Sequence, residues 1–390
     1  MTEVFYPSVD VANIKDLRFL VTDGKSFFDE EGVHTRETIE YIDPKAPGYL
    51  VRSRALSGAY TITKRIITDP GANCVVINTA FEAHKGNAKD YRLFVLFAPH
   101  IKNQGASNSG RCAEYDGRGY MIAWREDIAA ALTCSAPFLN MSAGFSGASD
   151  GWHDLKDNYV MDWMYERAEG GNIALTAELP AGSGEFDIVL GFGKDDVEAV
   201  IEANKSLERR YAAIEREFVK CWKKYMGGLA PLGRQSAAGP ALYYASAMVL
   251  KTHEDKARKG GVIASLSVPW GSAKGDRDAM GYHLVWPRDL VKAALAFMAM
   301  GDMSTPLDIL SFLRSTQNQD GSWPQNMRLD GTAHWPAVQL DEVALPVILA
   351  WRLKGMGSPV DDFYPMVKSA ASYIVRNGPV TEQERWEENG

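Results

Sequence analysis

Apolar and polar residues alternate in short runs over the first half of the chain, and glycine, aspartate and asparagine separate the runs. Alternation of this kind predicts half-buried strands, and many short strands with such turns are typical of packed antiparallel sheets. The clearest runs are 17–21, 60–66, 75–81, 91–97, 120–124 and 186–192. We therefore expect residues 1–194 to form an antiparallel β-sandwich domain.

The period of the pattern changes at Asp195-Asp196, where apolar residues begin to recur every three or four positions. Either aspartate can cap the start of a helix, and Gly227-Gly228 can end it. The pattern predicts one helix of roughly 30 residues, which is long for a single globular helix. We assign residues 195–234 to a helical linker.

The chain from residue 235 onward has the helical period, with helices expected at 239–254, 289–300, 305–317, 340–353 and 360–377. Short loops alternate with long ones that contain Gly, Pro and Trp, and long loops without secondary structure are usually functional. Helices of similar length joined in this way predict helical hairpins that close into a toroid. Residues 235–390 would be the first part of it.

Composition excludes some partners. The 390 residues are 46% hydrophobic and 24% charged, with a net charge of −8 and a pI near 5.5, which argues against nucleic acid and anionic membranes as partners. No apolar run reaches membrane-spanning length. The N-terminus shows no signal peptide, and localisation stays open between cytoplasmic and secreted. The four cysteines are far apart without CxxC spacing, so we expect thiols.

Aromatic residues stand beside charged residues three times in the last third of the chain. The stretches are 282–289 (YHLVWPRD), 321–342 (which includes Trp323, Trp335 and Asp341-Glu342) and 385–390 (RWEENG). Acid–base chemistry on a sugar needs a carboxyl group with a raised pKa and an aromatic surface for the ring. The repetition therefore points to a carbohydrate site, in which Arg288 and Asp289 bind hydroxyls and Tyr282 and Trp286 stack on the ring.

Each stretch also has a purely structural interpretation. Trp286-Pro287-Arg288-Asp289 can be a capped helix start with Arg288 in solvent. Trp323 and Trp335 can anchor a loop, and Asp341-Glu342 can complement a helix dipole. Trp386-Glu387-Glu388 can be a charged turn, although adjacent carboxylates beside an indole would raise a pKa as a general acid needs. His283 and His334 are not at metal-ligand spacing.

At these stretches the sequence resembles glycoside hydrolase family 15, the glucoamylase and glucodextranase family, and its prokaryotic members in particular. The segments that carry the resemblance are 265–271 (SLSVPWG), 281–289 (GYHLVWPRD), 320–326 (DGSWPQN), Trp335 with 339–342 (QLDE), and 386–388 (WEE). The opening segments 3–7 (EVFYP) and 19–24 (FLVTDG) resemble the prokaryotic β-domain. The likeness spans nearly the whole chain.

The resemblance implies a β-sandwich, a helical linker and an (α/α)6 barrel, and an inverting enzyme that releases β-glucose from the non-reducing ends of α-glucans. By motif, Glu387 resembles the general acid and Glu388 the neighbouring substrate-binding carboxylate. Arg288 and Asp289 resemble the pair that binds the terminal glucose. The aromatic walls would be Tyr282, Trp286, Trp335 and Trp386.

One departure from the family pattern concerns the catalytic base. An inverting enzyme needs a second carboxylate about 6.5–9.5 Å from the acid, and the family supplies it late in the barrel, beyond Gly390. A closed six-hairpin toroid also needs more helices than the five expected here. We therefore expect the chain to be a fragment that is inactive by itself and whose open half-barrel exposes apolar helix faces.

Other functions remain open at this point. Within the same chemistry, glucodextranase or trehalase-type specificity is the alternative, because no motif separates α-1,4 from α-1,6 or α,α-1,1 linkages. From other classes, the chain can be a non-catalytic carbohydrate-binding protein, or a helical toroid such as a terpene cyclase, which no acidic cluster supports. No cofactor is expected. A structural calcium ion stays open for an enzyme of this kind, although no contiguous loop of oxygen ligands stands out in the sequence.

Overall fold

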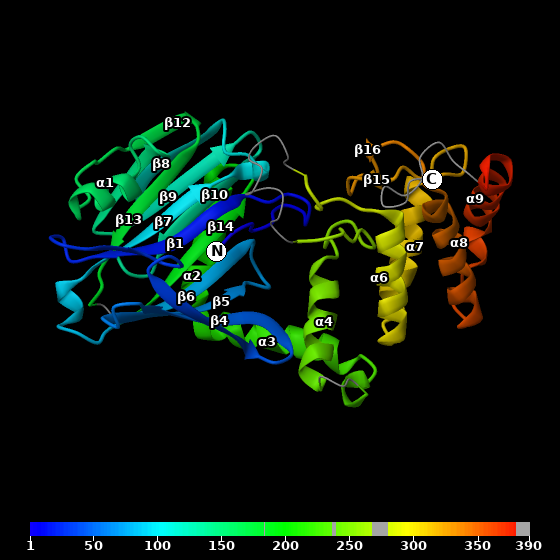
Figure 1. Ribbon diagram of the computed structural model, residues 1–390, viewed down its shortest axis with the longest axis horizontal. Coiled ribbons are helices and arrows are strands. Elements are labelled where there is room, and N and C mark those ends of the chain that lie inside the picture. Colours follow the sequence, from blue (N-terminus) through cyan, green and yellow to red (C-terminus); the bar gives the residue numbers. More distant parts are fainter. Residues whose placement is uncertain (183, 236–238, 267–279, 380–390) are drawn as a thin grey trace. The chain divides into compact units, whose positions relative to one another are not determined.

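The computed structural model describes residues 1–182, 184–235, 239–266 and 280–379. The chain forms two compact units. The first contains Met1–Tyr6 and Ala12–Lys224, and the second contains Pro7–Val11 and the described residues from Tyr225 onward. Each unit is considered by itself below, and Figure 1 gives the element labels.

The first unit is built from two antiparallel sheets, which confirms the predicted fold class. The five-stranded sheet has the order β11 (Asn140–Phe145), β13 (Ile173–Leu179), β7 (Arg92–Pro99), β1 (Ile14–Thr22), β2 (Phe28–Glu30). The nine-stranded sheet has the order β12 (Arg167–Gly171), β8 (Asn108–Tyr115), β9 (Arg118–Arg125), β10 (Ile128–Cys134), β14 (Glu185–Gly193), β6 (Cys74–Ala83), β5 (Tyr60–Thr68), β4 (Ala46–Ala55), β3 (Thr35–Asp43).

The two sheets face each other closely at Gly110 of β8. A Cβ atom at this position would lie 2.7 Å from Ile173 Cδ1 and 3.1 Å from Leu175 Cδ1, both on β13 of the other sheet. A glycine lets the sheets approach closely without a shift of these side chains, and Ile173 and Leu175 are fully buried there. Short helical segments connect the strands: η1 (Ala88–Asp90), η2 (Ile101–Asn103) and α1 (Gly151–Asn158).

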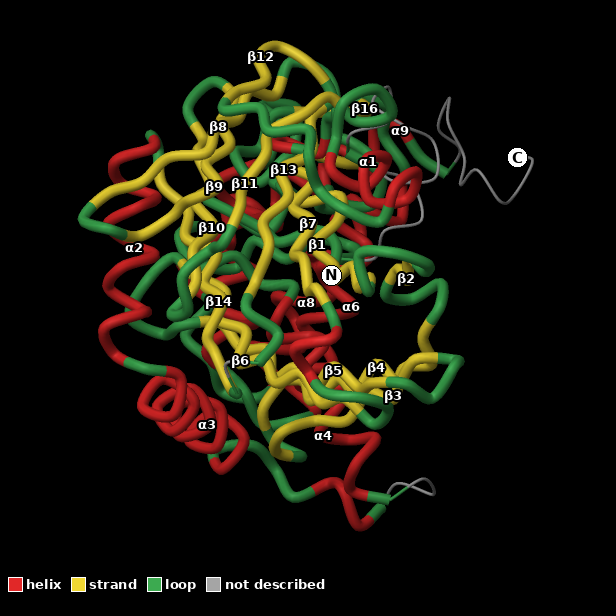
Figure 2. The backbone as a smooth tube through the Cα atoms, turned by 90° about the vertical axis from the view of Figure 1, so that its left-hand side faces the viewer, coloured by secondary structure: helices red, strands yellow, loops and turns green. Residues whose placement is uncertain are grey.

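The predicted single linker helix is wrong in one respect, because it is two helices, α2 (Asp196–Arg209) and α3 (Tyr211–Gly227). They meet at Arg210, whose φ of 62° and ψ of 141° end the first helix. Asp195 caps α2 by accepting a 2.8 Å hydrogen bond from the backbone N–H of Glu198, as the sequence predicted. Figure 2 shows the two helices as separate coils.

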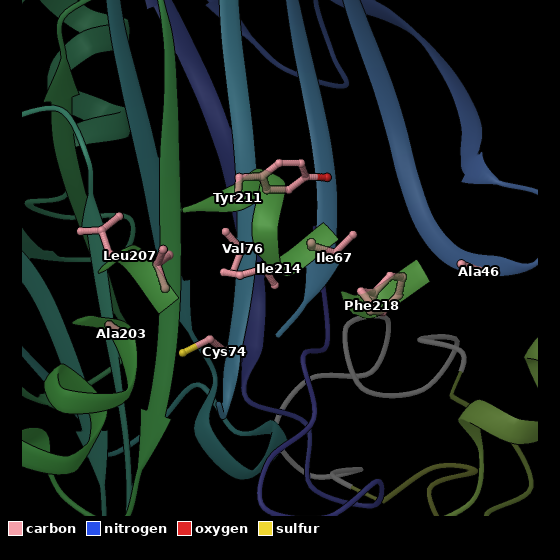
Figure 3. Close-up of a cluster of buried hydrophobic side chains, with 10 residues drawn as sticks. Ala46, Ile67, Cys74, Val76, Ala203, Leu207, Tyr211, Ile214 and Phe218 are labelled. Atoms are coloured by element: carbon pink, nitrogen blue, oxygen red, sulfur yellow. The ribbon is translucent and has the colours of Figure 1, made fainter. Parts of the chain in front are cut away.

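Both helices pack on the nine-stranded sheet through one buried hydrophobic cluster (Figure 3). Ala203 and Leu207 come from α2, and Ile214 and Phe218 come from α3. The opposite side of the cluster comes from strands of the sheet, with Ala46, Ile67, Cys74, Val76 and Val189. The predicted linker up to Lys224 thus belongs to the packing of the first unit rather than to a free connection.

In its described residues from 232 onward, the second unit contains the five helices that the sequence predicted, together with two 3₁₀ turns and a short hairpin. They are η3 (Leu232–Arg234), α4 (Pro240–Thr252), α6 (Pro287–Ala299), α7 (Ser304–Thr316), β15 (Asn326–Met327), β16 (Ala333–Trp335), α8 (Leu340–Gly355), η4 (Asp361–Phe363) and α9 (Tyr364–Asn377). Helices α6, α7, α8 and α9 lie side by side (Figure 1). Their long connections carry the predicted site residues.

Large apolar side chains are exposed on these helices, as expected for part of a barrel. Their exposed fractions reach 65% at Trp351 of α8, 66% at Tyr364 and 83% at Val375 of α9, and 54% at Leu242 of α4. The inner faces of α6 and α7 are buried, with Val291, Phe297, Ile309 and Leu310 among the fully covered residues. Contiguous exposed apolar surface favours association with other protein surface.

Candidate active site

Two of the motif stretches meet through backbone hydrogen bonds. The N–H of Val285 donates to Met327 O and the N–H of Met327 donates to Val285 O, each over 2.9 Å. In the adjoining hairpin, Asn326 pairs with Trp335. The stretch that leads into α6 therefore lies beside β15 of the hairpin that follows α7, and the sequence-predicted residues Trp286 and Trp335 lie on opposite sides of β15.

The aromatic residues of this structure differ in exposure. Tyr282 and Trp286 have ring centroids 5.9 Å apart at 44°. Trp286 is buried, whereas 37% of Tyr282 and 52% of Trp335 is exposed. The exposed rings of Tyr282 and Trp335 are thus available as surfaces for a sugar. The buried ring of Trp286 packs against Tyr282.

The loop after α7 is fixed by local interactions. The Asp320 carboxylate accepts hydrogen bonds from Ser322 N–H at 2.9 Å and from Ser322 Oγ at 2.7 Å. Gly321 has a φ of 99°, and a Cβ atom there would lie 2.3 Å from Ser369 O on α9, so only glycine fits. Trp323 is fully buried and its indole Nε1 donates to Leu313 O over 2.9 Å. Trp323 is therefore an anchor of the loop rather than a wall of a site.

Arg288 is buried at the start of α6, which contradicts the interpretation that places it in solvent. Pro287 is the first residue of the helix, as predicted, and 6% of Arg288 is exposed. Its Nη1 donates to Gln339 Oε1 over 2.9 Å and lies 3.1 Å from Asp341 Oδ2. Asp289, next along the helix, is exposed. The pair predicted to bind glucose thus consists of Arg288, which Gln339 and Asp341 hold in place, and Asp289, which is exposed to solvent.

Glu342 is the most deeply buried carboxyl group beside Arg288. It has no exposed surface, and its Oε1 lies 3.3 Å from Arg288 Nη1. Burial raises the pKa of Glu342 to about 9 against the lowering effect of Arg288, and the nearby charges of Asp341 and Asp289 raise it as well. The group is therefore protonated at neutral pH. The interpretation that Asp341 and Glu342 complement a helix dipole explains their position at the start of α8. It does not explain why Glu342 is buried.

Asn326 is on β15, between the segment that leads into α6 and strand β16. It is fully buried, and its Oδ1 accepts a 3.0 Å hydrogen bond from the backbone N–H of Trp335. That bond fixes which amide atom is oxygen, and Nδ2 has no hydrogen-bond partner among the described residues. Gln339, Glu342 and Asn326 lie inside the sequence motifs but were not predicted as site residues. All three are buried polar residues, and nothing local in the sequence marks that burial.

Three predicted site residues, Trp386, Glu387 and Glu388, lie outside the described residues, as do residues 267–271 of the first motif. In the part of the chain that the structure does describe, no group of three or more His, Cys, Asp or Glu side chains could hold a metal ion. No helix there is long and apolar enough to cross a membrane.

The sequence matches two known family profiles that together cover most of the chain. Residues 1–227 match the glucodextranase domain N, and residues 238–390 match the glycosyl hydrolases family 15. The chain belongs to glycoside hydrolase family 15. This confirms the resemblance on which the sequence analysis relied, and it fits a β-sandwich followed by the helical unit of the family.

Among its relatives, a glucoamylase of Clostridium sp. (strain G0005) is 38% identical over 391 residues, which is 100% of this chain and 55% of the relative. An uncharacterized glycosyl hydrolase of Methanocaldococcus jannaschii is 28% identical over 120 residues, covering 30% of this chain and 18% of the relative. This family 15 chain thus spans about half the length of the glucoamylase that it matches.

Solved structures of other glycoside hydrolases also resemble this chain. A bacterial glucoamylase complexed with acarbose has a TM-score of 0.93 and 38% identity, and the match covers 99% of this chain and 56% of that one. A family GH92 α-mannosidase of Bacteroides thetaiotaomicron has a TM-score of 0.52 at 11% identity and covers 94% of this chain and 48% of that one. The second likeness extends to the fold alone.

Proposed function

We propose that the protein to which this chain belongs is an exo-acting glucan hydrolase of the glucoamylase type, which releases β-glucose from non-reducing ends by an inverting mechanism. The observation that carries the proposal is the 38% identity to a glucoamylase along the whole chain, β-sandwich and helices alike. The substrate would be an α-1,4-linked oligo- or polysaccharide.

The geometry of the helical unit supports sugar binding. Arg288 is held by Gln339 and Asp341, and Asp289 is open to solvent at the same helix start. We propose that this pair binds the hydroxyl groups of the terminal glucose, because a fixed guanidinium donates hydrogen bonds and a carboxylate accepts them. Tyr282 and Trp335 would supply the aromatic surfaces.

Glu387 is proposed as the general acid that protonates the glycosidic oxygen, with Glu388 and Trp386 binding substrate beside it. The inverting mechanism also needs a carboxylate base on the opposite side of the sugar, about 6.5–9.5 Å from the acid, which activates water. The proposal places that base in sequence beyond Gly390. Catalysis is thus assigned to the full-length protein rather than to this chain alone.

Glucodextranase specificity is the second candidate, because residues 1–227 match the N domain named after that enzyme. The two candidates differ in linkage, α-1,6 rather than α-1,4. Nothing in the described geometry distinguishes the two, and the Arg288 cluster serves either, since both substrates present a terminal glucose.

A substrate panel tests the proposal. Full-length protein is incubated with maltooligosaccharides, isomaltooligosaccharides and trehalose, and released glucose is measured over time. Preferred release from maltooligosaccharides supports the glucoamylase type, and preferred release from isomaltooligosaccharides supports glucodextranase. Calorimetric binding of acarbose in the absence of any glucose release would instead favour a non-catalytic carbohydrate-binding protein.

A further inference from the structure

Glu342 contacts Arg288 but is shielded from solvent. Both of its carboxyl oxygens are inaccessible, and neither forms a geometrically complete hydrogen bond with another described group. The side chain of Asp341, by contrast, is 33% exposed. A sugar that reaches Arg288 from solvent would therefore not touch Glu342, so any effect of Glu342 on the sugar must pass through the arginine.

We propose that Glu342 is a positioning residue that holds the Arg288 guanidinium in the orientation required for sugar binding, without touching the sugar. The inference rests on the proposed function, because it takes the binding role of Arg288 from there. It assigns a task to a buried carboxyl group that the proposed mechanism does not otherwise use.

The shape of the arginine head group decides how well it binds a ligand. A guanidinium is a planar fork of five donors, and it recognises a ligand well only when the plane is fixed. Gln339 and Asp341 bind the same atom, Nη1, at 2.9 Å and 3.1 Å. Two acceptors on one atom constrain the fork only at that atom. The buried carboxyl group of Glu342 adds a third oxygen, 3.3 Å from Nη1, and this polar contact is what a leucine of similar volume would lose.

The three partners come from one short segment at the start of α8, whereas Arg288 is on α6. Glu342 N–H donates to Gln339 O over 3.1 Å, which fixes this segment in the first helical turn. The charges around Glu342 are Arg288 and Asp289 on α6 and Asp341 on α8. Since these two carboxylates are already present beside one cation, a neutral Glu342 avoids a further buried negative charge. A neutral amide of the same shape should then replace it.

The test measures acarbose binding by isothermal titration calorimetry with full-length protein. Glu342→Leu fills the space but removes the polar group, and Glu342→Gln keeps a neutral polar group of the same shape. We expect about 10- to 100-fold weaker binding for Glu342→Leu, since a displaced guanidinium loses charge-assisted hydrogen bonds to the sugar. We expect Glu342→Gln to bind within about threefold of wild type.

Leu353→Ala is the matched control, since Leu353 is fully buried on the same helix but far along it from Arg288. It should lower the melting temperature and leave acarbose affinity unchanged. The rescue by glutamine separates positioning from stability, because a purely structural role would make affinity follow the melting temperature in all variants. If Glu342→Leu does not fold, Glu342→Ala replaces it with the same expectation.

Two results would overturn the inference. One is a folded Glu342→Leu or Glu342→Ala variant that binds acarbose as wild type does, and the other is a Glu342→Gln variant as weak as the leucine variant. Both leave the proposed function intact if wild type binds acarbose and releases glucose. If wild type neither binds acarbose nor releases glucose from any substrate of the panel, it is the proposed function that fails, and the positioning role falls with it.

Discussion

Val285 and Met327 exchange two backbone hydrogen bonds of 2.9 Å, although they stand in different motif stretches of the sequence. This isolated bridge sets Trp286 next to Asn326, and Asn326 in turn pairs with Trp335. Trp286 and Trp335 belong to separate motif stretches of the sequence, but they are therefore parts of one small structure beside the start of α6. The segment that contains Val285 continues directly into Arg288 at the start of α6.

The two tryptophans of the loop that follows α7 should respond differently to substitution. Trp323→Phe removes the buried hydrogen bond to Leu313 O and should lower the free energy of unfolding by about 1–3 kcal/mol without changing acarbose affinity. Trp335→Ala, at a site with 52% exposure, should change stability by less than about 0.5 kcal/mol and weaken acarbose binding. Thermal unfolding and calorimetry on both variants check this. Equal effects of the two substitutions on affinity would contradict it.

Arg288→Lys should weaken acarbose binding although it keeps the positive charge. A lysine cannot reproduce the planar fork, and hydrogen bonds to charged groups contribute about 1.5–3 kcal/mol, or roughly 10- to 150-fold in affinity. Arg352→Lys on the exposed face of α8 is the control and should bind as wild type does. Wild-type affinity in Arg288→Lys would remove Arg288 from the site.

Glu342 should make the protein less stable as the pH rises. Its pKa is raised from 4.5 to about 9 in the folded state, so between these values the folded protein holds a proton that the unfolded chain has lost. The resulting stabilisation is complete below about pH 4.5 and is lost progressively as the pH rises toward about 9. Glu342→Gln has no such proton. The melting temperature of wild type relative to this variant should therefore fall from pH 5 to pH 9, and a constant difference would contradict the raised pKa.

Arg210 should be a site where glycine stabilises the first unit. Its φ of 62° and ψ of 141° are strained for a residue with a Cβ atom, at a cost of about 1–3 kcal/mol. Arg210→Gly relieves this strain and loses part of the gain to chain entropy, so the free energy of unfolding should rise by about 1 kcal/mol. Arg210→Ala keeps the strain and should give no gain. Denaturant unfolding measures both.

Much of the fold could be predicted from the sequence because its periodic signals were strong. Helices α4, α6, α7, α8 and α9, which lie in the described residues of the second unit, were all expected, and α8 (Leu340–Gly355) was placed from its first residue. Strand β10 (Ile128–Cys134) was missed, since every residue in it is buried and the alternation that marks a strand is absent. The break at Arg210 was missed because nothing in the apolar period marks a single residue with positive φ.

The site was predicted in its residue types and less well in their tasks. Trp335 and Tyr282 are exposed, as a sugar surface requires, but Trp323 is a buried anchor and Trp286 is covered. Whether Arg288 is solvated cannot be read from four residues at a helix start, because its burial depends on Gln339 and Glu342, which arrive from another helix more than fifty positions later. Long-range burial of this kind leaves no local pattern.

The most direct measurement for the whole account is the anomer of the released sugar. Full-length wild type, Glu387→Gln and the control Arg352→Lys are incubated with maltooligosaccharides and followed by NMR from the first minutes. The account predicts β-glucose from wild type and from Arg352→Lys, and a rate about 10²–10⁴-fold lower in Glu387→Gln, since general acid catalysis contributes about that much. Release of α-glucose, or wild-type activity in Glu387→Gln, would contradict it.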